Sequence, residues 1–324
     1  MKLLKGSANY LNCIEKRDKG ALNYLMLNLP FHCNYKCQKC CNEDRISQST
    51  PLNLETIKKY VEKCKQHDFR VLVIAGEGEP FLDKNIKELI SFTHGAGFIP
   101  YIFTNGSMIN QDLALFLAKN DVSLIINIDS FIAEEYDKYI CRKRAFERIM
   151  SNLKVLRDIY QQKVYSEAGY LVSFLAINLV LNNENKDQIS KLIQFCGDDI
   201  IPVVNRPIKI GSAAQSWKKY KDAESIEIDE TNLFPLGTIT GDDQCSYLRN
   251  GISLGADGNI LTCAYALDTN DLYGNLNDDI LLTHKKVLES VNDFYKENGA
   301  ARCILRHPKY NKFISYLKTK KLFS

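Results

Sequence analysis

The strongest constraint on the fold is a regular alternation of apolar strand-like runs and helical segments between residues 24 and 205. Short apolar runs predict strands at residues 24–29, 70–75, 98–103, 123–128, 170–181 and 200–205. Apolar residues at helical spacing predict helices between them, at residues 54–65, 86–96, 113–119, 145–160 and 186–196. Strands that alternate with helices join through right-handed crossovers into a parallel sheet. The sequence therefore predicts an α/β fold, either an open doubly wound sheet or a partial barrel.

The alternation of predicted strands and helices ends after residue 207. Residues 212–244 are polar with few periodic apolar positions, which predicts a linker or a segment that contacts substrate. A new unit begins at Cys245 with a predicted hairpin, residues 251–254 and 260–263, whose turn contains Gly258. We therefore expect an N-terminal extension (1–22), a core domain (23–211), the linker (212–244) and a small cysteine-rich C-terminal domain (245–324).

The composition of the chain excludes several classes of partner. Lys and Arg number 42 against 39 Asp and Glu, and basic residues concentrate only in the tail, so no nucleic-acid partner is expected. No apolar run resembles a signal sequence or could cross a bilayer, which predicts a cytoplasmic protein without a membrane partner. In that reducing compartment the eleven cysteines indicate metal binding or catalysis rather than disulfides.

Three of these cysteines lie within eight residues, directly after the first predicted strand: Cys33, Cys37 and Cys40. Such a loop can ligate three irons of a 4Fe–4S cluster and leave the fourth iron open to a ligand. A structural zinc site is the alternative, although zinc sites usually use paired C-x2-C units. Cys41 follows as an extra thiol and could replace Cys40 as a ligand.

The spacing C-x3-C-x2-C resembles that of radical S-adenosylmethionine (SAM) enzymes, and the resemblance extends to about residue 205. Residues 76–80, Gly-Glu-Gly-Glu-Pro, resemble the family's G-G-E-P turn, and Lys39 departs from it where an aromatic residue is common. The resemblance implies a partial (β/α)6-type barrel with SAM bound at the carboxyl ends of its strands. The matching positions for SAM contacts are Gly78, Glu79, Thr104, Asn105, Asn127, Asp129, Ser130 and, on the fifth strand, Ser173.

A second group of cysteines resembles the family's auxiliary-cluster extensions, called SPASM or, when shortened, twitch domains. Cys245 and Cys263 lie on either side of the predicted hairpin turn, and Cys303 is a third candidate ligand. The resemblance implies a second 4Fe–4S cluster, whose fourth ligand could be His307, water or the substrate. A small zinc knuckle or two core cysteines are the alternatives.

The resemblance implies an enzyme that reductively cleaves SAM to a 5′-deoxyadenosyl radical and removes hydrogen from an unactivated carbon. An electron donor of the flavodoxin or ferredoxin type would supply the electron, and the auxiliary cluster could accept the electron left on the substrate. Because only 32 residues precede Cys33, no leader-binding domain is expected. That expectation favours a small-molecule substrate over a peptide. A peptide or protein maturase of the same family is the alternative, and a zinc-binding module without enzymatic activity is the lesser one.

Overall fold

The computed structural model describes residues 2–18, 20–30, 32–41, 50–75, 77–160, 164–215, 217–221, 223–228, 233 and 245–321. In these ranges the main sheet has eight strands in the order β11-β10-β2-β3-β4-β5-β8-β9. All neighbours from β10 to β9 pair in parallel, and only β11 is antiparallel. The six strands of the core are β2 (Tyr24–Leu27), β3 (Val71–Ile74), β4 (Ile99–Thr104), β5 (Ser123–Asn127), β8 (Leu175–Val180) and β9 (Ile201–Asn205).

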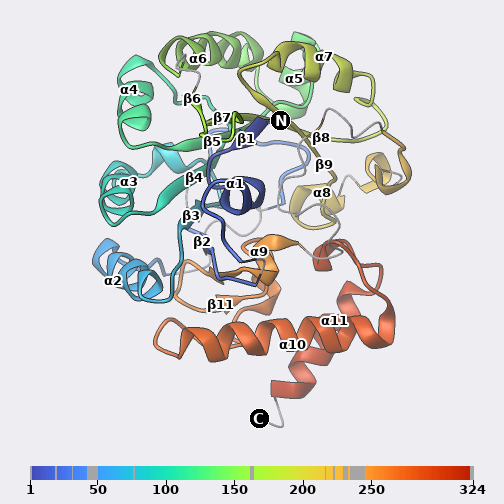
Figure 1. The fold of residues 1–324 in the computed structure, drawn as a ribbon. Coiled ribbons are helices and arrows are strands. Elements are labelled where there is room, and N and C mark those ends of the chain that lie inside the picture. The colour runs from blue at the N-terminus through green and yellow to red at the C-terminus, as the bar shows by residue number, and fades with distance from the viewer. Residues whose placement is uncertain are drawn as a thin grey trace.

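Helices between these strands cover the outer face of the sheet and follow one another around it (Figure 1). They are α2 (Leu54–Lys65), α3 (Ile86–Gly95), α4 (Gln111–Lys119), α5 (Ala133–Ile140), α6 (Ala145–Ile159) and α7 (Gln188–Cys196). The predicted α/β fold with parallel strands is confirmed, and every predicted helix forms. Helix α5 is an addition, since the sequence analysis predicted no helix between residues 128 and 145.

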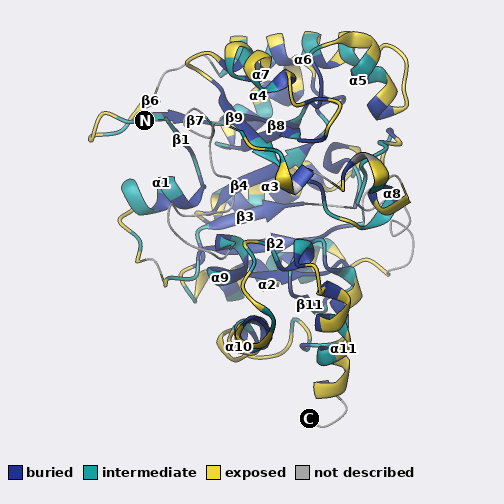
Figure 2. Ribbon diagram, turned by 90° about the vertical axis from the view of Figure 1, so that its right-hand side faces the viewer, coloured by how far each residue is buried: buried dark blue, intermediate teal, exposed yellow. Residues whose placement is uncertain are grey.

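Each core strand buries both of its faces, as the apolar runs predict. In β3, Leu72 and Ile74 pack against the outer helices, whereas Val71 and Val73 point to an inner core. This alternation follows from the two-residue period of a strand. Full burial of each such side chain contributes roughly 1.5–3 kcal/mol. Figure 2 shows the core strands mostly buried, whereas the outer helices carry many exposed residues.

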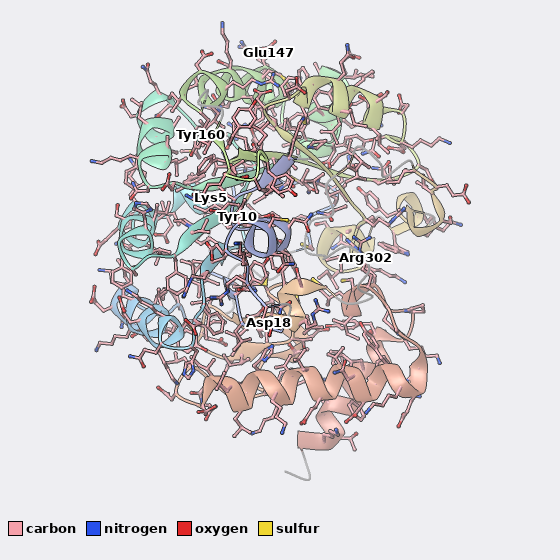
Figure 3. The ribbon with its side chains drawn as sticks, in the orientation of Figure 1. Lys5, Tyr10, Asp18, Glu147, Tyr160 and Arg302 are labelled. Atoms are coloured by element: carbon pink, nitrogen blue, oxygen red, sulfur yellow. The ribbon has the colours of Figure 1, made fainter. Side chains whose placement is uncertain are left out.

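The N-terminal segment closes the end of the barrel where the strands begin. It forms β1 (Lys2–Leu4) and α1 (Ala8–Cys13), and in Figure 3 Tyr10 lies in front of the middle of the sheet. Leu4 and Leu11 belong to the inner core. Gly6 joins the two elements with a φ of +83°, and a Cβ there would lie 3.0 Å from Ile99 Cγ2. Glycine is therefore needed at this position for both its φ and its size.

One predicted strand is divided in two. Residues 170–181 form β7 (Leu171–Ser173) and β8, which belong to different sheets, because β7 pairs with β1 and with β6 (Val164–Tyr165). Ser173 marks the break, since its hydroxyl accepts a hydrogen bond from the Leu175 N–H at 3.1 Å. The hydroxyl thus satisfies a backbone donor locally where the strand changes partners.

The predicted hairpin forms and extends the main sheet. Its strands are β10 (Gly251–Leu254) and β11 (Ile260–Leu261), and β10 pairs in parallel with β2. Close pairing needs a glycine at residue 251, since a Cβ there would lie 2.7 Å from the Tyr24 Cβ. The C-terminal region is therefore continuous with the core sheet, and the predicted domain boundaries stay a prediction. Part of the predicted linker, residues 229–232 and 234–244, lies outside the described residues.

In the described residues, five further α-helices were not predicted from the sequence: α1, α8 (Gly211–Gln215), α9 (Ser246–Arg249), α10 (Ile280–Asn298) and α11 (Tyr310–Lys321). The long helix α10 packs below the hairpin through Val287, Val291 and Phe294, while Leu281 and Leu282 are exposed. Within the described ranges, no helix is both long and apolar enough to cross a membrane.

Candidate active site

Three cysteines of the loop after β2 lie near one another. The pKa of the Cys37 thiol is raised mainly by burial, and the neighbouring Cys40 and Cys33 thiols raise it further. The backbone N–H of Tyr35 points at the Cys33 sulfur at 3.4 Å. Two backbone hydrogen bonds, of 3.0 and 3.4 Å, fix the loop to the C-terminal end of α5. The loop therefore presents three thiols at the carboxyl end of β2.

Glu79 is a buried acid beside this loop. Its carboxylate accepts hydrogen bonds from Thr104 Oγ1 at 2.7 Å and from the N–H groups of Asn105 at 2.8 Å and Phe81 at 3.2 Å. Burial raises the pKa of Glu79 to about 7, because these bonds offset only part of the loss of water. The Glu79 N–H bonds the His32 carbonyl oxygen at 2.9 Å. The end of β3 is thus tied to the residue that precedes the first cysteine.

Asn105 connects the end of β4 to the same loop. Its Nδ2 donates to Asn34 Oδ1 at 3.0 Å and lies 3.9 Å from the Cys33 sulfur. Gly78 is half-buried and directly precedes Glu79. The structure therefore brings the predicted residues at the ends of β3 and β4 together with the first cysteine. Their contacts with SAM stay a prediction.

A row of three amides crosses the inner face, from Asn127 at the end of β5 through Asn178 within β8 to Asn205 at the end of β9. Asn178 Nδ2 donates to Asn127 Oδ1 at 2.7 Å, and Asn205 Nδ2 donates to Asn178 Oδ1 at 2.8 Å. Of the three, the sequence analysis named only Asn127. A lone amide within the apolar run Leu-Ala-Ile-Asn-Leu-Val was the available signal for Asn178.

The unusual Lys39 has a clear structural role. Its ammonium forms an ion pair with Asp129, whose side chain is buried. Both charges affect the pKa of the Cys37 thiol, which indicates that the ion pair lies close to Cys37. The neighbouring Ser130 hydroxyl donates to Glu135 Oε2 at 2.6 Å at the start of α5. Asp129 and Ser130 therefore already have protein partners beside the first cysteine loop.

Ser173 lies apart from the other predicted contacts. Its hydroxyl hydrogen-bonds the carbonyl oxygens of Leu175 at 3.0 Å and Asp199 at 2.8 Å. These residues precede or begin β8 and β9, so they lie at the amino ends of the strands, opposite Thr104 and Asn105. The structure does not bring Ser173 together with the first cysteine loop.

The C-terminal cysteines form a second group. Burial raises the pKa of Cys245 to about 11, and the nearby Cys303 thiol also raises it. The pKa of Cys263 is raised by burial, and then by Cys303 and Cys245. Backbone N–H groups already point at these sulfurs, from Tyr265 to Cys263 and from Tyr247 to Cys245. Cysteines from both sides of the hairpin and from the segment that follows α10 therefore lie near one another.

Both groups of thiols fit an iron–sulfur cluster. Among the described residues, no three Cys, His, Asp or Glu side chains are close enough to hold one metal ion. A zinc ion would need its sulfurs about 2.3 Å from a single centre, whereas a cluster of several irons holds its thiolates further apart. Hydrogen bonds from N–H groups to sulfur, present in both groups, are also typical of iron–sulfur sites.

Several known proteins are similar to this chain in sequence. The chain is 24% identical to the Fe-coproporphyrin III synthase of Methanosarcina barkeri over 67% of its own length and 55% of the relative's. It is 26% identical to the cysteine-type anaerobic sulfatase-maturating enzyme of Clostridium novyi, over 54% of this chain and 48% of that one. The chain thus spans about half the length of these curated relatives.

Among solved structures, Streptococcus suis SuiB bound to the precursor peptide SuiA is similar in fold, with a TM-score of 0.58 and 16% identity. That match covers 82% of this chain and 65% of SuiB. The predicted fold class and the likeness to the auxiliary-cluster type are confirmed. The family model described as the radical SAM superfamily matches residues 27–196. The chain therefore belongs to the radical SAM superfamily, whose enzymes bind a 4Fe–4S cluster and S-adenosylmethionine.

Proposed function

We propose that this chain reductively cleaves SAM and removes a hydrogen atom from an unactivated carbon of a small-molecule substrate. The observation that carries the proposal is the grouping of Cys33, Cys37 and Cys40 with a buried acid, Glu79, at the carboxyl ends of parallel strands. Ligands of α/β barrels bind at this end of the strands. The superfamily's cluster and SAM together supply the radical chemistry, and the protein supplies binding, orientation and exclusion of water.

The residues of the first site have distinct roles in this proposal. Cys33, Cys37 and Cys40 ligate three irons, and the fourth iron stays open for SAM. Gly78 and Glu79 hold the positively charged amino group of SAM, because a buried carboxylate pairs strongly with an ammonium group. Thr104 and Asn105 position the Glu79 carboxylate through hydrogen bonds of 2.7 and 2.8 Å.

The other residues predicted to contact SAM receive different roles in this proposal. Asn127, at the end of the amide row, faces the inside of the barrel and contributes hydrogen bonds to SAM or substrate. Asp129 acts through its ion pair with Lys39, which fixes the cysteine loop against β5. We assign Ser130 to the start of α5 and leave Ser173 out of the proposed site, since it lies at the amino ends of the strands.

The second cysteine group holds the auxiliary 4Fe–4S cluster, with Cys245, Cys263 and Cys303 as ligands. Its supporting observation is the mutual proximity of the three thiols together with backbone N–H groups directed at two of them. A cluster held by these three cysteines would supply an electron acceptor, and the overall reaction would then be an oxidation of the substrate.

The amide row favours a small polar substrate. Asn127, Asn178 and Asn205 carry hydrogen-bonding groups on the inner face of three neighbouring strands. The name of the M. barkeri relative likewise denotes synthesis of a small molecule. The alternative is a peptide or protein maturase, which is favoured by the likeness to the sulfatase-maturating enzyme of C. novyi.

A basic hollow beside the cysteine loop suits an acidic electron donor of the flavodoxin or ferredoxin type. Its volume is about 360 Å³, and Glu147, labelled in Figure 3, lines it. The other lining side chains include one aromatic ring and four cations: Tyr35, Arg142, Lys143, Arg144 and Arg148. Arg142 donates to the Asn34 carbonyl oxygen at 3.1 Å, so the hollow adjoins the loop that carries the three cysteines.

Anaerobic reconstitution tests the proposal. The full chain is loaded with iron and sulfide, reduced with dithionite, and assayed for 5′-deoxyadenosine. We expect about eight irons per chain, from two 4Fe–4S clusters, and SAM cleavage that a Cys37→Ala variant loses. Cys13→Ala is the matched control, since Cys13 ends α1 at the opposite end of the barrel. A colourless protein, or one that forms no 5′-deoxyadenosine, would refute the proposal.

The same assay separates the two substrate classes. A true substrate increases 5′-deoxyadenosine formation above the uncoupled background, so small polar molecules and peptides are compared in parallel. Stimulation by peptides alone would support the maturase alternative and overturn the small-molecule assignment. The cytoplasmic location stays a prediction.

A further inference from the structure

Cys41 extends the first cysteine loop toward the C-terminal region. A Cβ on Gly211, the first residue of α8, would lie 2.6 Å from the Cys41 carbonyl carbon and 2.6 Å from the Cys40 carbonyl oxygen. The Ala213 N–H donates to the Cys40 carbonyl oxygen at 3.3 Å. The end of the loop is therefore packed closely against the start of α8.

The C-terminal cysteines are tied to the same two segments. Arg306, three residues after Cys303, donates to the Pro207 carbonyl oxygen at 3.3 Å, shortly before α8. At the hairpin, Asn28 Nδ2 donates to the Ala264 carbonyl oxygen at 2.6 Å, and Ala264 follows Cys263. Asn28 directly follows β2, which leads into the cysteine loop. The beginning of that loop thus contacts a residue next to Cys263, and its end packs against α8, whose preceding segment contacts Arg306.

The Cys41 thiol acts electrostatically on residues of the second cysteine group. Cys41 raises the pKa of the Cys263 thiol, after burial and the thiols of Cys303 and Cys245. It also raises the pKa of Tyr265, whose N–H points at the Cys263 sulfur. By contrast, the thiols that act on the pKa of Cys37 are those of Cys40 and Cys33. The Cys41 thiol therefore lies within electrostatic reach of Cys263, one thiol of the second group.

We infer that Cys41 is the fourth ligand of the auxiliary cluster, which is then held by Cys41, Cys245, Cys263 and Cys303 and has no open iron. Four thiolates are the usual ligand set of a closed 4Fe–4S cluster. The inference rests on the proposed function, because that proposal assigns the auxiliary cluster to the C-terminal cysteines.

The other ligand considered from the sequence, His307, already has partners at both ring nitrogens. Its Nδ1 accepts a hydrogen bond from the Lys309 N–H at 3.0 Å. Its Nε2 therefore carries the proton, and it lies 3.1 Å from the Gly299 carbonyl oxygen. The ring is also buried, at 6% exposure. Binding iron would cost His307 one of these hydrogen bonds, and only the deprotonated thiol or neutral imidazole can serve as a ligand.

A closed auxiliary cluster changes what the second site can do. Without an open iron it cannot bind substrate directly, so its role is electron transfer. Cys40 and Cys41 are consecutive, and their Cα atoms are about 3.8 Å apart. If Cys40 holds the first cluster and Cys41 the second, one peptide unit would connect the ligands of the two clusters and would supply a short covalent route for an electron.

The test uses the full chain without its first cluster. A variant with Cys33→Ala, Cys37→Ala and Cys40→Ala, called the three-alanine variant, is reconstituted anaerobically and analysed for iron, sulfide and the EPR spectrum of the reduced cluster. We expect about four irons per chain and a spectrum that does not change when imidazole is added. Each further change, at Cys41 or at His307, is made in this background.

Adding Cys41→Ala, or the closer mimic Cys41→Ser, is expected to have one of two effects. Either at least one iron per chain is lost, or four irons remain and the EPR spectrum now responds to imidazole. His307→Ala is the control and is expected to change neither readout. Circular dichroism checks that each variant is folded. If the Cys41→Ala variant is not folded, the Cys41→Ser variant is used in its place.

Three results would overturn the inference. The three-alanine variant could bind no iron, its spectrum could already respond to imidazole, or the Cys41 variants could match it in iron content and spectrum. None of these measurements uses SAM. They are therefore distinct from a failure of the proposed function, which would appear as absence of 5′-deoxyadenosine from the unaltered chain.

Discussion

Glu79→Gln is the most informative single change in the first site. Glu79 is 1% exposed, and burial raises its pKa to about 7. Below that pH the side chain is mostly neutral, and above it the side chain is mostly ionised. If the carboxylate holds the amino group of SAM, only the ionised form binds well, so the affinity for SAM must rise with pH around 7.

The size of the effect follows from the pKa. Between pH 7 and pH 6 the ionised fraction of Glu79 falls from about one half to about one tenth, so SAM binding weakens about fivefold. The amino group, with an ordinary pKa near 7.7–8.0, stays protonated over this range and adds little. Glutamine cannot ionise, so the variant loses the pH dependence. It also loses one charge-assisted hydrogen bond of about 1.5–3 kcal/mol, which corresponds to roughly 10- to 150-fold weaker binding at pH 7.

Equilibrium dialysis of SAM against the anaerobically reconstituted protein at pH 6.0, 6.5 and 7.0 measures both effects. Glu55→Gln, an exposed acid of α2 that pairs with Lys58, is the control and should keep the fivefold change. Equal affinity at all three pH values in the unaltered protein would refute the reasoning. The same pH dependence in the Glu79→Gln protein would show that another group is responsible.

Three further predictions concern docking and stability. Arg144→Glu combined with Arg148→Glu should slow reduction by an acidic protein donor about tenfold at low salt but leave reduction by dithionite unchanged, as stopped-flow absorbance would show. Leu4→Ala removes a fully buried side chain from the inner core and should lower the free energy of unfolding of the iron-free protein by about 2–5 kcal/mol in denaturant titrations. Gly106 has a φ of +70°, and a Cβ there would lie 2.4 Å from Ile149 Cδ1, so Gly106→Ala should lower the melting temperature and cost at least about 1–2 kcal/mol.

The core of the fold could be predicted because its signals are local. A parallel strand covered by helices must be apolar on both faces, and such runs are visible at β3 and β5 without any knowledge of their partners. Strand partners are not a local property. Nothing in the sequence near Gly251 indicates that it pairs with Tyr24, so the hairpin was predicted but its place in the main sheet was not. The division of residues 170–181 likewise depends on β1, which takes β7 as its partner.

The first site was predictable for a similar reason. The spacing of Cys33, Cys37 and Cys40 is a local pattern, and residues that follow parallel strands must meet at one edge of the sheet. The ion pair between Lys39 and Asp129 could not be predicted, because it depends on how the loop packs against β5. In the sequence Lys39 therefore appeared only as a departure from the family pattern.

The pairing of β10 with β2 explains how one chain can hold two cysteine groups in fixed relation. Strand β2 leads directly into the first cysteine loop, and β10 leads into the hairpin that carries Cys263. Because the two strands are hydrogen-bonded in parallel, neither group can shift without disturbing the main sheet. The bond of 2.6 Å from Asn28 to the Ala264 carbonyl oxygen adds a second link beyond the strand ends. A continuous sheet therefore holds the two cysteine groups at a fixed distance, as the electron transfer in the proposed function requires.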